Sequence, residues 1–588
     1  MDRNLRERRQ NAMDFYRQNN RVLEQLERAL NEMCVRRPND LFGYLAEFFI
    51  PLSATPLISR VEGVEVLDSR GGPSIQAQVY CTLRNQEKFF SSGSVSSHFG
   101  SSASSEERQE QVRKALQWIQ EVNQQLHGLS PEEQSKVDQI LSDLYWSRLQ
   151  ELTDHSSRTP TETPPVVIRG KKRAAVKIQP PPEPPELLLS GGLAVGALSL
   201  SVARAGAQSR GLPLYKYITE LKTRSQRPPE GLVSPLSPPP EGLVSPSSRP
   251  PEGLVSPSSP PPEGLHSPTL LVPLFSCGRS SPGKLHLFEE VLLIPKPGLR
   301  TRQVVLVAQQ LQQEVFRIHA AQTKATAGAV SLSDSGAPHL PADRLEQPLE
   351  LLTEACAQLQ LGPELRLGLS CAGPHLYDQS KGKYEVMCAV LKSPDETVDL
   401  LQSLLLKFPS VVLLIDPLRR EDVDQWQRLS ASCSLLSDIT FREQAPPPPG
   451  VTGHILKHVN HVTITDLIQA SIHRHGSMLL GPSYSEPSCD SALPDLAVGL
   501  GLDFLKLGGL SGEERTSRYN RLMRIEEELE QEGRLCLKEK RLPPIFIQRP
   551  VCVTQNSGMS PQPPPTCDAC NIVTTRRRQE PMGFTPVC

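Results

Sequence analysis

The sequence predicts an α/β protein in which a β/α (TIM-like) barrel follows a helical N-terminal module and is accompanied by Pro-rich insertions. Three observations support this fold class. Short apolar runs alternate with amphipathic stretches over residues 269–541. Residues 1–55 carry apolar side chains at helical spacing. The chain also has 56 prolines among 588 residues, concentrated in segments too poor in apolar residues to form a core.

Residues 1–55 predict a small helical module for docking or dimerisation. Apolar residues recur at 3-4-3 spacing along 23–33, which indicates an amphipathic helix. Pro38-Asn39-Asp40 ends this helix and caps a second one with an aromatic face. Helices this short need a packing partner. The segment resembles the docking modules of regulatory subunits, which dimerise and bind anchoring helices. Packing of the two helices on the rest of the chain is the alternative.

The proline surplus lies in three segments that predict spacers between folded parts. In 224–268, Glu-Gly-Leu recurs with a period of 11 in a Pro/Ser-rich linker. A second insertion spans about 156–186, and its basic cluster at 171–173 is either a solvated linker or a localisation signal. The tail, 542–588, contains Cys567-x-x-Cys570, for which free thiols and a metal site are the two alternatives.

The charge and cysteine content exclude several classes of protein. With 63 Lys+Arg against 65 Asp+Glu, the chain lacks the basic surplus of a nucleic-acid binder. The first residues do not resemble a signal peptide, and no apolar stretch approaches the ~20 residues that a membrane helix needs. The 13 cysteines are scattered along the chain, which predicts reduced thiols and a cytoplasmic location.

The alternation of strands and helices is the main support for the barrel. Apolar runs bounded by turn residues predict strands, and the stretches between them predict helices. Because many such units follow one another, we expect a mostly parallel sheet closed into a barrel. The predicted strands are 290–295, 366–371, 411–416, 435–438, 455–457, 461–464, 478–480 and 504–507, and the predicted helices include 421–432, 466–475 and 493–500.

Two lysines at the ends of predicted strands are candidate functional residues. In barrel enzymes the chemistry lies at the carboxyl ends of the strands. Lys506 falls within an apolar run, and Lys457 ends the predicted strand 455–457. Because a barrel interior rarely holds an unpaired charge, each lysine is either paired, functional or turned to the surface.

Several motifs resemble those of the enolase family. The resemblance covers about 61–535 and is strongest toward its C-terminal end, and the chain is most similar to a divergent, testis-type branch of that family. It implies an α+β domain over 61–223, with the Pro-rich insertion inside it, and a barrel domain over 269–541. The matching motifs are Val66-Leu-Asp-Ser-Arg-Gly-Gly-Pro-Ser74, 196–218, Phe288-Glu-Glu-Val-Leu-Leu-Ile-Pro295, 505–515 and Arg524-Ile-Glu-Glu-Glu-Leu529.

The resemblance implies that the protein dehydrates 2-phosphoglycerate to phosphoenolpyruvate in glycolysis, with Mg²⁺ as cofactor. Position by position, Lys457 matches the catalytic base that removes the C2 proton. Lys506 and Glu290 match residues that contact the substrate. Asp438 matches one of three carboxylates that bind Mg²⁺ in the family.

Other positions depart from the family pattern. Ser370 and Ile415 occupy the two remaining metal-ligand positions, and neither offers a charged oxygen. Residues 333–336 replace the loop with the general acid, so that its Glu is replaced by Asp334 or Ser335. Ser281 aligns with the family's loop histidine, and 92–95 only approximates its mobile serine loop.

The retained lysines and the altered metal ligands leave two hypotheses. The first is an enolase-like hydro-lyase with a degraded Mg²⁺ site around Asp438. Asp416, next to Ile415, is expected to point to the other side of the barrel wall unless the strand is bulged. The second is a catalytically weak or inactive scaffold that anchors glycolytic or cytoskeletal partners. Family resemblance implies a homodimer, or a heterodimer with other enolase subunits. Binding of an anchoring protein through residues 1–50 and a location in the sperm flagellum are further hypotheses.

Overall fold

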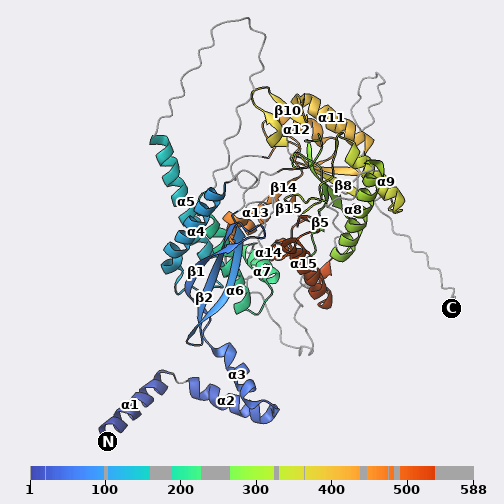
Figure 1. Cartoon of the computed structure of the whole chain (residues 1–588). Coiled ribbons are helices and arrows are strands. Elements are labelled where there is room, and N and C mark those ends of the chain that lie inside the picture. Colours follow the sequence, from blue (N-terminus) through green and yellow to red (C-terminus); the bar gives the residue numbers. More distant parts are fainter. Residues whose placement is uncertain are drawn as a thin grey trace, which may run out of the picture. The chain divides into compact units, whose positions relative to one another are not determined.

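The computed structural model describes residues 2–19, 21–97, 104–158, 189–226, 265–323, 330–362, 365–371, 373–437, 447–456, 459–473, 476–481 and 490–536. The central parts of both Pro-rich insertions and the cysteine-containing tail therefore lie outside the described residues. The described part contains N-terminal helices, an antiparallel sheet with its helices, and a β/α barrel (Figure 1). This architecture confirms the α/β fold class expected from the sequence. No helix in these ranges is long and apolar enough to cross a membrane.

The N-terminal module consists of α1 (Asp2–Gln18), α2 (Arg21–Arg36), α3 (Leu41–Phe49) and the 3₁₀ turn η1 (Ile50–Leu52). The two helices expected from the sequence are α2 and α3, whereas α1 was not predicted because its composition is dominated by charged and amide side chains. Asp40 caps α3 by accepting a hydrogen bond from the backbone N–H of Gly43 at 2.9 Å.

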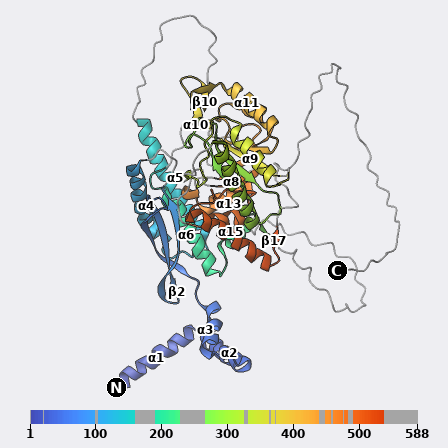
Figure 2. The ribbon, with the colours of Figure 1, turned by 45° about the vertical axis from the view of Figure 1, so that its right-hand side comes forward.

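The next part is an antiparallel sheet in the order β1–β2–β3, formed by Leu57–Leu67, Pro73–Leu83 and Gln86–Ser96. Helices α4 and α6 pack against it (Figure 2). The segment 92–95, whose sequence only approximates the family's mobile serine loop, lies within β3, where Gly93 pairs with Ala77 of β2. The helices of this part are α4 (Ser105–Leu126), α5 (Gln134–Arg158), α6 (Leu193–Ser209) and α7 (Leu214–Gln226).

The barrel is a sheet in the order β5–β16–β15–β14–β13–β12–β8–β7–β6. Only Leu271 separates β5 from β6, and its N–H bonds the carbonyl of Leu505 at 2.9 Å, so the first and last strands of this order are one continuous segment. The sheet therefore closes on itself. Its strands are β5 (Thr269–Leu270), β6 (Val272–Ser276), β7 (Phe288–Ile294), β8 (Arg366–Cys371), β12 (Val411–Ile415), β13 (Ser434–Ser437), β14 (Gly453–Leu456), β15 (Ser477–Leu480) and β16 (Phe504–Leu505).

Most of the remaining elements are the connections between these strands. The longer helices are α8 (Thr301–Thr323), α9 (Gln347–Gln358), α11 (Pro394–Lys407), α12 (Val423–Ser430), α13 (Ile464–His473), α14 (Ala492–Leu500) and α15 (Glu513–Gln531). Short elements are α10 (Gly373–Leu376), η2 (Val459–His461), the sheet of β9 (Tyr377–Asp378), β10 (Lys383–Met387) and β11 (Val390–Lys392), and the pair β4 (Leu265–His266) and β17 (Leu535–Cys536).

The strand predicted at 461–464 is wrong. This segment ends η2 and begins α13. Thr463 and Asp466 form a reciprocal cap, in which the Asp466 N–H bonds Thr463 Oγ1 at 3.1 Å and the Thr463 hydroxyl bonds Asp466 Oδ2 at 2.7 Å. This capping pair outweighs the strand preference of the β-branched residues Val462, Thr463 and Ile464.

Two apolar clusters form on the two sides of the barrel wall. Side chains alternate along each strand between the interior and the surrounding helices. One strand, β7, runs antiparallel to its neighbours β6 and β8. Its amino end therefore lies beside the carboxyl ends of the parallel strands. The interior cluster comprises Leu271, Leu292, Ile294, Leu413, Ile415, Leu436, Ile455, Leu479 and Phe504.

Candidate active site

A buried ion pair lies at the end of the barrel where the parallel strands finish. Glu290 stands near the amino end of β7, and Lys506 follows β16 directly. Lys506 Nζ lies 2.6 Å from Glu290 Oε2, and the two side chains are only 12% and 8% exposed. The Lys506 N–H bonds the carbonyl of Leu480 at 2.9 Å, which holds the lysine in line with the barrel wall. The structure thus brings together two of the residues expected from the sequence to contact substrate.

The strand register places three further side chains beside Glu290. Its Cα partners are Ser276 on β6 and Ser370 on β8, and Ser370 is in turn the partner of Ile415 on β12. Directly opposite residues on neighbouring strands share a face of the sheet. Ile415 belongs to the interior cluster, so this row of four residues faces the barrel interior.

The residues in this row do not fit the Mg²⁺ site that the family resemblance implies. Ile415 is 5% exposed and packs among interior apolar side chains, where it offers no oxygen ligand. Ser370 offers a neutral hydroxyl in place of a carboxylate. Within the described ranges, no three His, Cys, Asp or Glu side chains are grouped so that they could hold a metal ion. Mg²⁺ requires several hard oxygen ligands in octahedral geometry, and this row supplies too few.

Asp416 takes a special backbone conformation at the end of β12. Its φ of 48° lies in the left-handed region, which a non-glycine residue rarely adopts. Its N–H bonds the carbonyl of Leu436 at 3.0 Å, and Ser437 donates its hydroxyl to Asp416 Oδ1 at 3.1 Å. The backbone therefore leaves the strand conformation at Asp416, and its carboxylate accepts a hydrogen bond from the neighbouring strand β13.

Lys457 and Asp438 lie outside the described residues. In the sequence, Asp438 follows β13 directly and Lys457 follows β14 directly. Leu436 and Ile455, two positions earlier in each case, belong to the interior cluster. The roles expected for Lys457 as a base and Asp438 as a metal ligand remain predictions.

The turn at 333–336, which replaces the family's general-acid loop, is held by two arginines. Arg70, from the turn between β1 and β2, pairs with the Asp334 carboxylate at 3.1 Å and donates to the Asp334 carbonyl at 2.8 Å. Arg515 donates to the same carbonyl at 2.9 Å. Ser335 bonds Ser333 through their hydroxyls at 3.0 Å. The Asp334 carboxylate is thus committed to an ion pair, although it remains 56% exposed.

A histidine that the sequence analysis did not single out lies next to this turn. His339 Nδ1 is 2.6 Å from the hydroxyl oxygen of Ser281, and that oxygen is 3.1 Å from the hydroxyl of Ser276. Ser281 is the residue that aligns with the family's loop histidine. A histidine three residues after Gly336, in the same loop as the expected general acid, was the signal in the sequence that could have identified His339.

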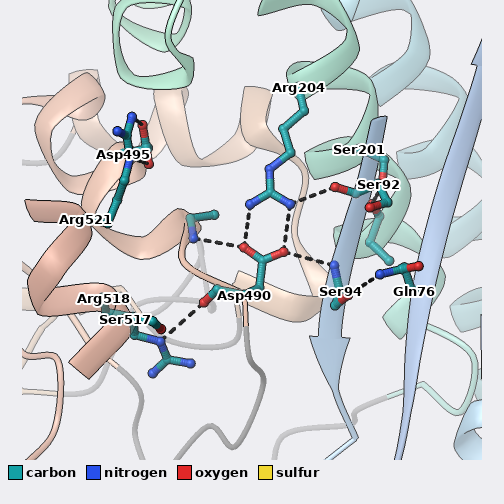
Figure 3. A network of polar contacts seen from close by, with 12 residues as sticks. Gln76, Ser92, Ser94, Ser201, Arg204, Asp490, Asp495, Ser517, Arg518 and Arg521 are labelled. Atoms are coloured by element: carbon teal, nitrogen blue, oxygen red, sulfur yellow. Dashed lines mark hydrogen bonds and ion pairs between the residues drawn. The ribbon is translucent and has the colours of Figure 1, made fainter. Parts of the chain in front are cut away.

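A second polar network fixes β3 to the barrel (Figure 3). The Arg204 guanidinium forms a bidentate pair with the Asp490 carboxylate at 2.6 and 2.8 Å and donates to the carbonyl of Ser92 at 2.7 Å. The same carboxylate accepts the Ser94 N–H at 3.1 Å and the Ala492 N–H at 2.9 Å. The antiparallel sheet is therefore connected to the segment that begins α14.

A buried carboxylate joins α5 and α6 to the start of α13. Asp138 accepts hydrogen bonds from Gln134 and Ser199 on one oxygen, and from both the N–H and the hydroxyl of Thr465 on the other, at 2.6–2.9 Å. Burial raises the pKa of Asp138 to about 6, while these hydrogen bonds, first those from Ser199 and Thr465, act in the opposite direction. The negative charge lies at the helix N-terminus, where it interacts favourably with the helix dipole.

Comparison with known proteins shows that the chain is similar to enolases. A family model described as "Enolase, C-terminal TIM barrel domain" matches residues 268–541. Enolase 4 of Danio rerio is 38% identical over 565 residues, which cover 88% of this chain and 91% of the relative. Enolase 4 of Homo sapiens is 35% identical, covering 92% and 91% of the two chains. An enolase of Methanococcus maripaludis is 25% identical over 58% of this chain and 72% of its own length.

Proposed function

Because the chain belongs to the enolase family, we propose that it is a hydro-lyase that converts 2-phosphoglycerate to phosphoenolpyruvate and water. Family membership, with enolase 4 as a similar relative over most of the length, confirms the resemblance noted from the sequence motifs. The single observation that carries the proposal is the buried pair of Lys506 and Glu290 at the carboxyl end of the barrel. Buried charges at this end of a barrel are typical of a catalytic site.

Each of the retained residues has a role in the proposal. Lys457 removes the C2 proton of the substrate as a general base. The Lys506 ammonium binds an anionic group of 2-phosphoglycerate, which carries both a carboxylate and a phosphate. Glu290 neutralises Lys506 in the free enzyme and accepts a hydrogen bond from the substrate once the ammonium turns to the anion. The role of Lys457 is supported by its position in the sequence directly after β14, in which Ile455 faces the interior.

Mg²⁺ dependence is implied by the family relationship, but Ser370 and Ile415 do not fit an Mg²⁺ site. The steps of the proposed reaction are therefore assigned to side chains of this chain. If the protein binds Mg²⁺, Asp438 is the remaining carboxylate of the family pattern, and a single charged ligand predicts weak affinity.

The proposal is tested by following phosphoenolpyruvate formation from 2-phosphoglycerate with purified full-length protein. Lys457→Ala is expected to abolish turnover, since general acid–base catalysis contributes on the order of 10²–10⁴-fold. Lys407→Ala is the control, because Lys407 pairs on the surface with Glu350 at 2.9 Å and is 53% exposed. Absence of turnover in the wild-type protein, alone and mixed with an ordinary enolase subunit, would contradict the proposal and favour the scaffold.

We also infer that the N-terminal module binds a helical anchoring partner, while the enolase part forms a homodimer or a heterodimer with other enolase subunits. The apolar side chains of α2 support the first inference, because Leu23, Leu26 and Leu30 are each 42–54% exposed. A stripe of this kind on a short helix is suited to packing against another helix. A location in the sperm flagellum belongs to this same proposal.

A further inference from the structure

Three side chains form a hydrogen-bonded chain that leads from the loop at 337–340 into the barrel interior. His339 Nδ1 lies 2.6 Å from Ser281 Oγ, and Ser281 Oγ lies 3.1 Å from Ser276 Oγ. Ser276 is the Cα partner of Glu290 across the β6–β7 pair, so both side chains stand on the interior face. The imidazole is thereby connected to a hydroxyl beside the substrate-contacting carboxylate.

Backbone hydrogen bonds hold these three residues in place. The Ser276 N–H bonds the carbonyl of Pro338 at 2.9 Å, and the Leu340 N–H bonds the carbonyl of Ser276 at 2.7 Å, so that His339 lies alongside the end of β6. Ser276 and Ser281 are 3% and 8% exposed. Because their hydroxyls are largely removed from water, each depends on the other and on the imidazole for hydrogen bonds.

The surroundings of the His339 imidazole have opposite effects on its pKa. Burial lowers its pKa, whereas the negative charge of Asp334 and a hydrogen bond to the carbonyl of Leu332 raise it. Arg70 and Arg515 contact Asp334 and moderate its charge. Burial has the largest effect, so the pKa of His339 lies below the ordinary imidazole value of 6.5, and the imidazole takes up a proton as the solution becomes acidic.

Resting on the proposed function, we infer that His339 is a positioning and proton-relay residue for loss of the 3-hydroxyl of 2-phosphoglycerate. It acts through Ser281 and Ser276. The relay thereby takes the role of the family's general acid, which is replaced at 333–336. A histidine on this loop also compensates for the missing imidazole at Ser281. The inference rests on the unbroken hydrogen-bond path from His339 to the interior face.

The relay balances protons and electrons. Lys457 takes the C2 proton, and the electron pair left at C2 forms the C2–C3 double bond while the C3–O bond breaks with its electrons on oxygen. That oxygen takes a proton from Ser276, which takes one from Ser281, which takes one from the His339 imidazolium. Water and phosphoenolpyruvate leave, Lys457 is protonated, and His339 is neutral. Exchange of one proton with solvent at each of the two residues restores the starting state.

The test compares wild-type protein with His339→Asn and Ser281→Ala in steady-state assays over a range of pH. Asn can still donate a hydrogen bond to Ser281 but cannot titrate. His339→Asn is therefore expected to lower kcat about 10²-fold with KM unchanged, and to remove the fall of kcat as pH rises through the imidazole pKa. Ser281→Ala should have a similar effect, and the double variant should be no slower. His319→Asn is the control, because His319 on α8 is another part-buried histidine whose pKa is lowered by burial.

A second measurement separates this inference from the proposed function. Exchange of the substrate's C2 proton with deuterated solvent depends on Lys457 and should persist in His339→Asn. If His339→Asn keeps the wild-type kcat and pH profile, the relay is wrong while the proposed function stands. If the variant also loses C2 exchange while its thermal unfolding is unchanged, His339 acts before hydroxyl loss and the relay is again wrong. Wild-type protein that neither exchanges the proton nor forms product overturns both.

Discussion

At the scale of single residues, Ile415 is the position where this barrel differs most from a metal-binding one. Its neighbours in the register are Ser370 and Leu436, so three adjacent positions across β8, β12 and β13 present no carboxylate. An apolar side chain here joins the interior cluster. The neighbouring Glu290 is already neutralised by Lys506 at 2.6 Å. Within the described part of the site, this carboxylate is therefore balanced in charge without a cation.

Two substitutions are expected to give this row the ability to bind Mg²⁺. In Ser370→Asp/Ile415→Glu, two carboxylates join Glu290, and the uncompensated charges should destabilise the protein until a cation binds. Saturating Mg²⁺ should then raise the free energy of unfolding by about 2.7 kcal/mol at a concentration 100 times the Kd. Thermal unfolding and titration calorimetry measure this. Ser370→Asn/Ile415→Gln is the matched uncharged control, and an equal response of the wild-type protein to Mg²⁺ would contradict the expectation.

Whether a contact in this site can be predicted from the sequence depends on how far apart its two residues lie along the chain. Glu290 and Lys506 could be identified because each lies within a local motif. The pairing of Ser281 with His339 could not, since it joins residues 58 positions apart and depends on a bridge between β6 and an irregular loop. The spacing of residues within a local motif carries no information about such a contact.

At the scale of elements, the barrel's helices are positioned by caps and buried polar groups as much as by apolar faces. The predicted helices 421–432, 466–475 and 493–500 correspond to α12, α13 and α14 with boundaries shifted by a few residues. Apolar periodicity predicts that a helix exists, but its ends depend on side-chain caps. Asp138 is such a group for α13, and it lies on α5, more than 300 residues earlier in the chain. Only tertiary structure could reveal it.

The buried Asp138 predicts a measurable pH dependence of stability. Its pKa of about 6 in the folded protein exceeds the ordinary value of 3.8. The folded state therefore binds this proton more readily than the unfolded state. The resulting contribution of Asp138 to the stability of the folded state is largest below about pH 4 and is lost as pH rises through about 6. The difference between the two pKa values corresponds to a change of roughly 3 kcal/mol in the free energy of unfolding.

Asp138→Asn should remove this part of the pH dependence. The variant is also expected to be less stable at every pH, because an amide cannot accept all four hydrogen bonds. Denaturant unfolding of both proteins between pH 4 and 7 measures the difference. Asp143→Asn, on an exposed position of the same helix, is the control and should leave the pH profile unchanged. A wild-type-minus-variant difference that stays constant with pH would show that Asp138 does not titrate in this range.

At the scale of the whole molecule, charged and polar groups add to the apolar packing of α6 and α7 where the antiparallel sheet and its helices contact the barrel. Arg204 reaches Asp490, Arg70 reaches Asp334, and Asp138 reaches Thr465. Each of these contacts touches a segment near the carboxyl ends of the barrel strands or the helix that follows. Gly196 shows how closely the two parts approach, because a Cβ there would lie 2.3 Å from the carbonyl oxygen of Asn460. The sheet domain thus supports the loops of the candidate site.

The N-terminal module contrasts with this arrangement, because many of its apolar side chains are exposed. Besides the stripe on α2, Val35 and Phe42 are 83% and 84% exposed. Exposed apolar side chains concentrated on short helices are typical of a binding surface. We therefore expect deletion of residues 1–50 to leave turnover and the thermal unfolding of the remaining chain unchanged, while abolishing co-purification with a helical anchoring protein. Leu23→Glu/Leu30→Glu in the full chain should have the same effect, whereas Arg28→Glu, on a charged position of the same helix, should retain binding. Loss of turnover on deletion would contradict this separation and would place the module on the enolase part of its own chain.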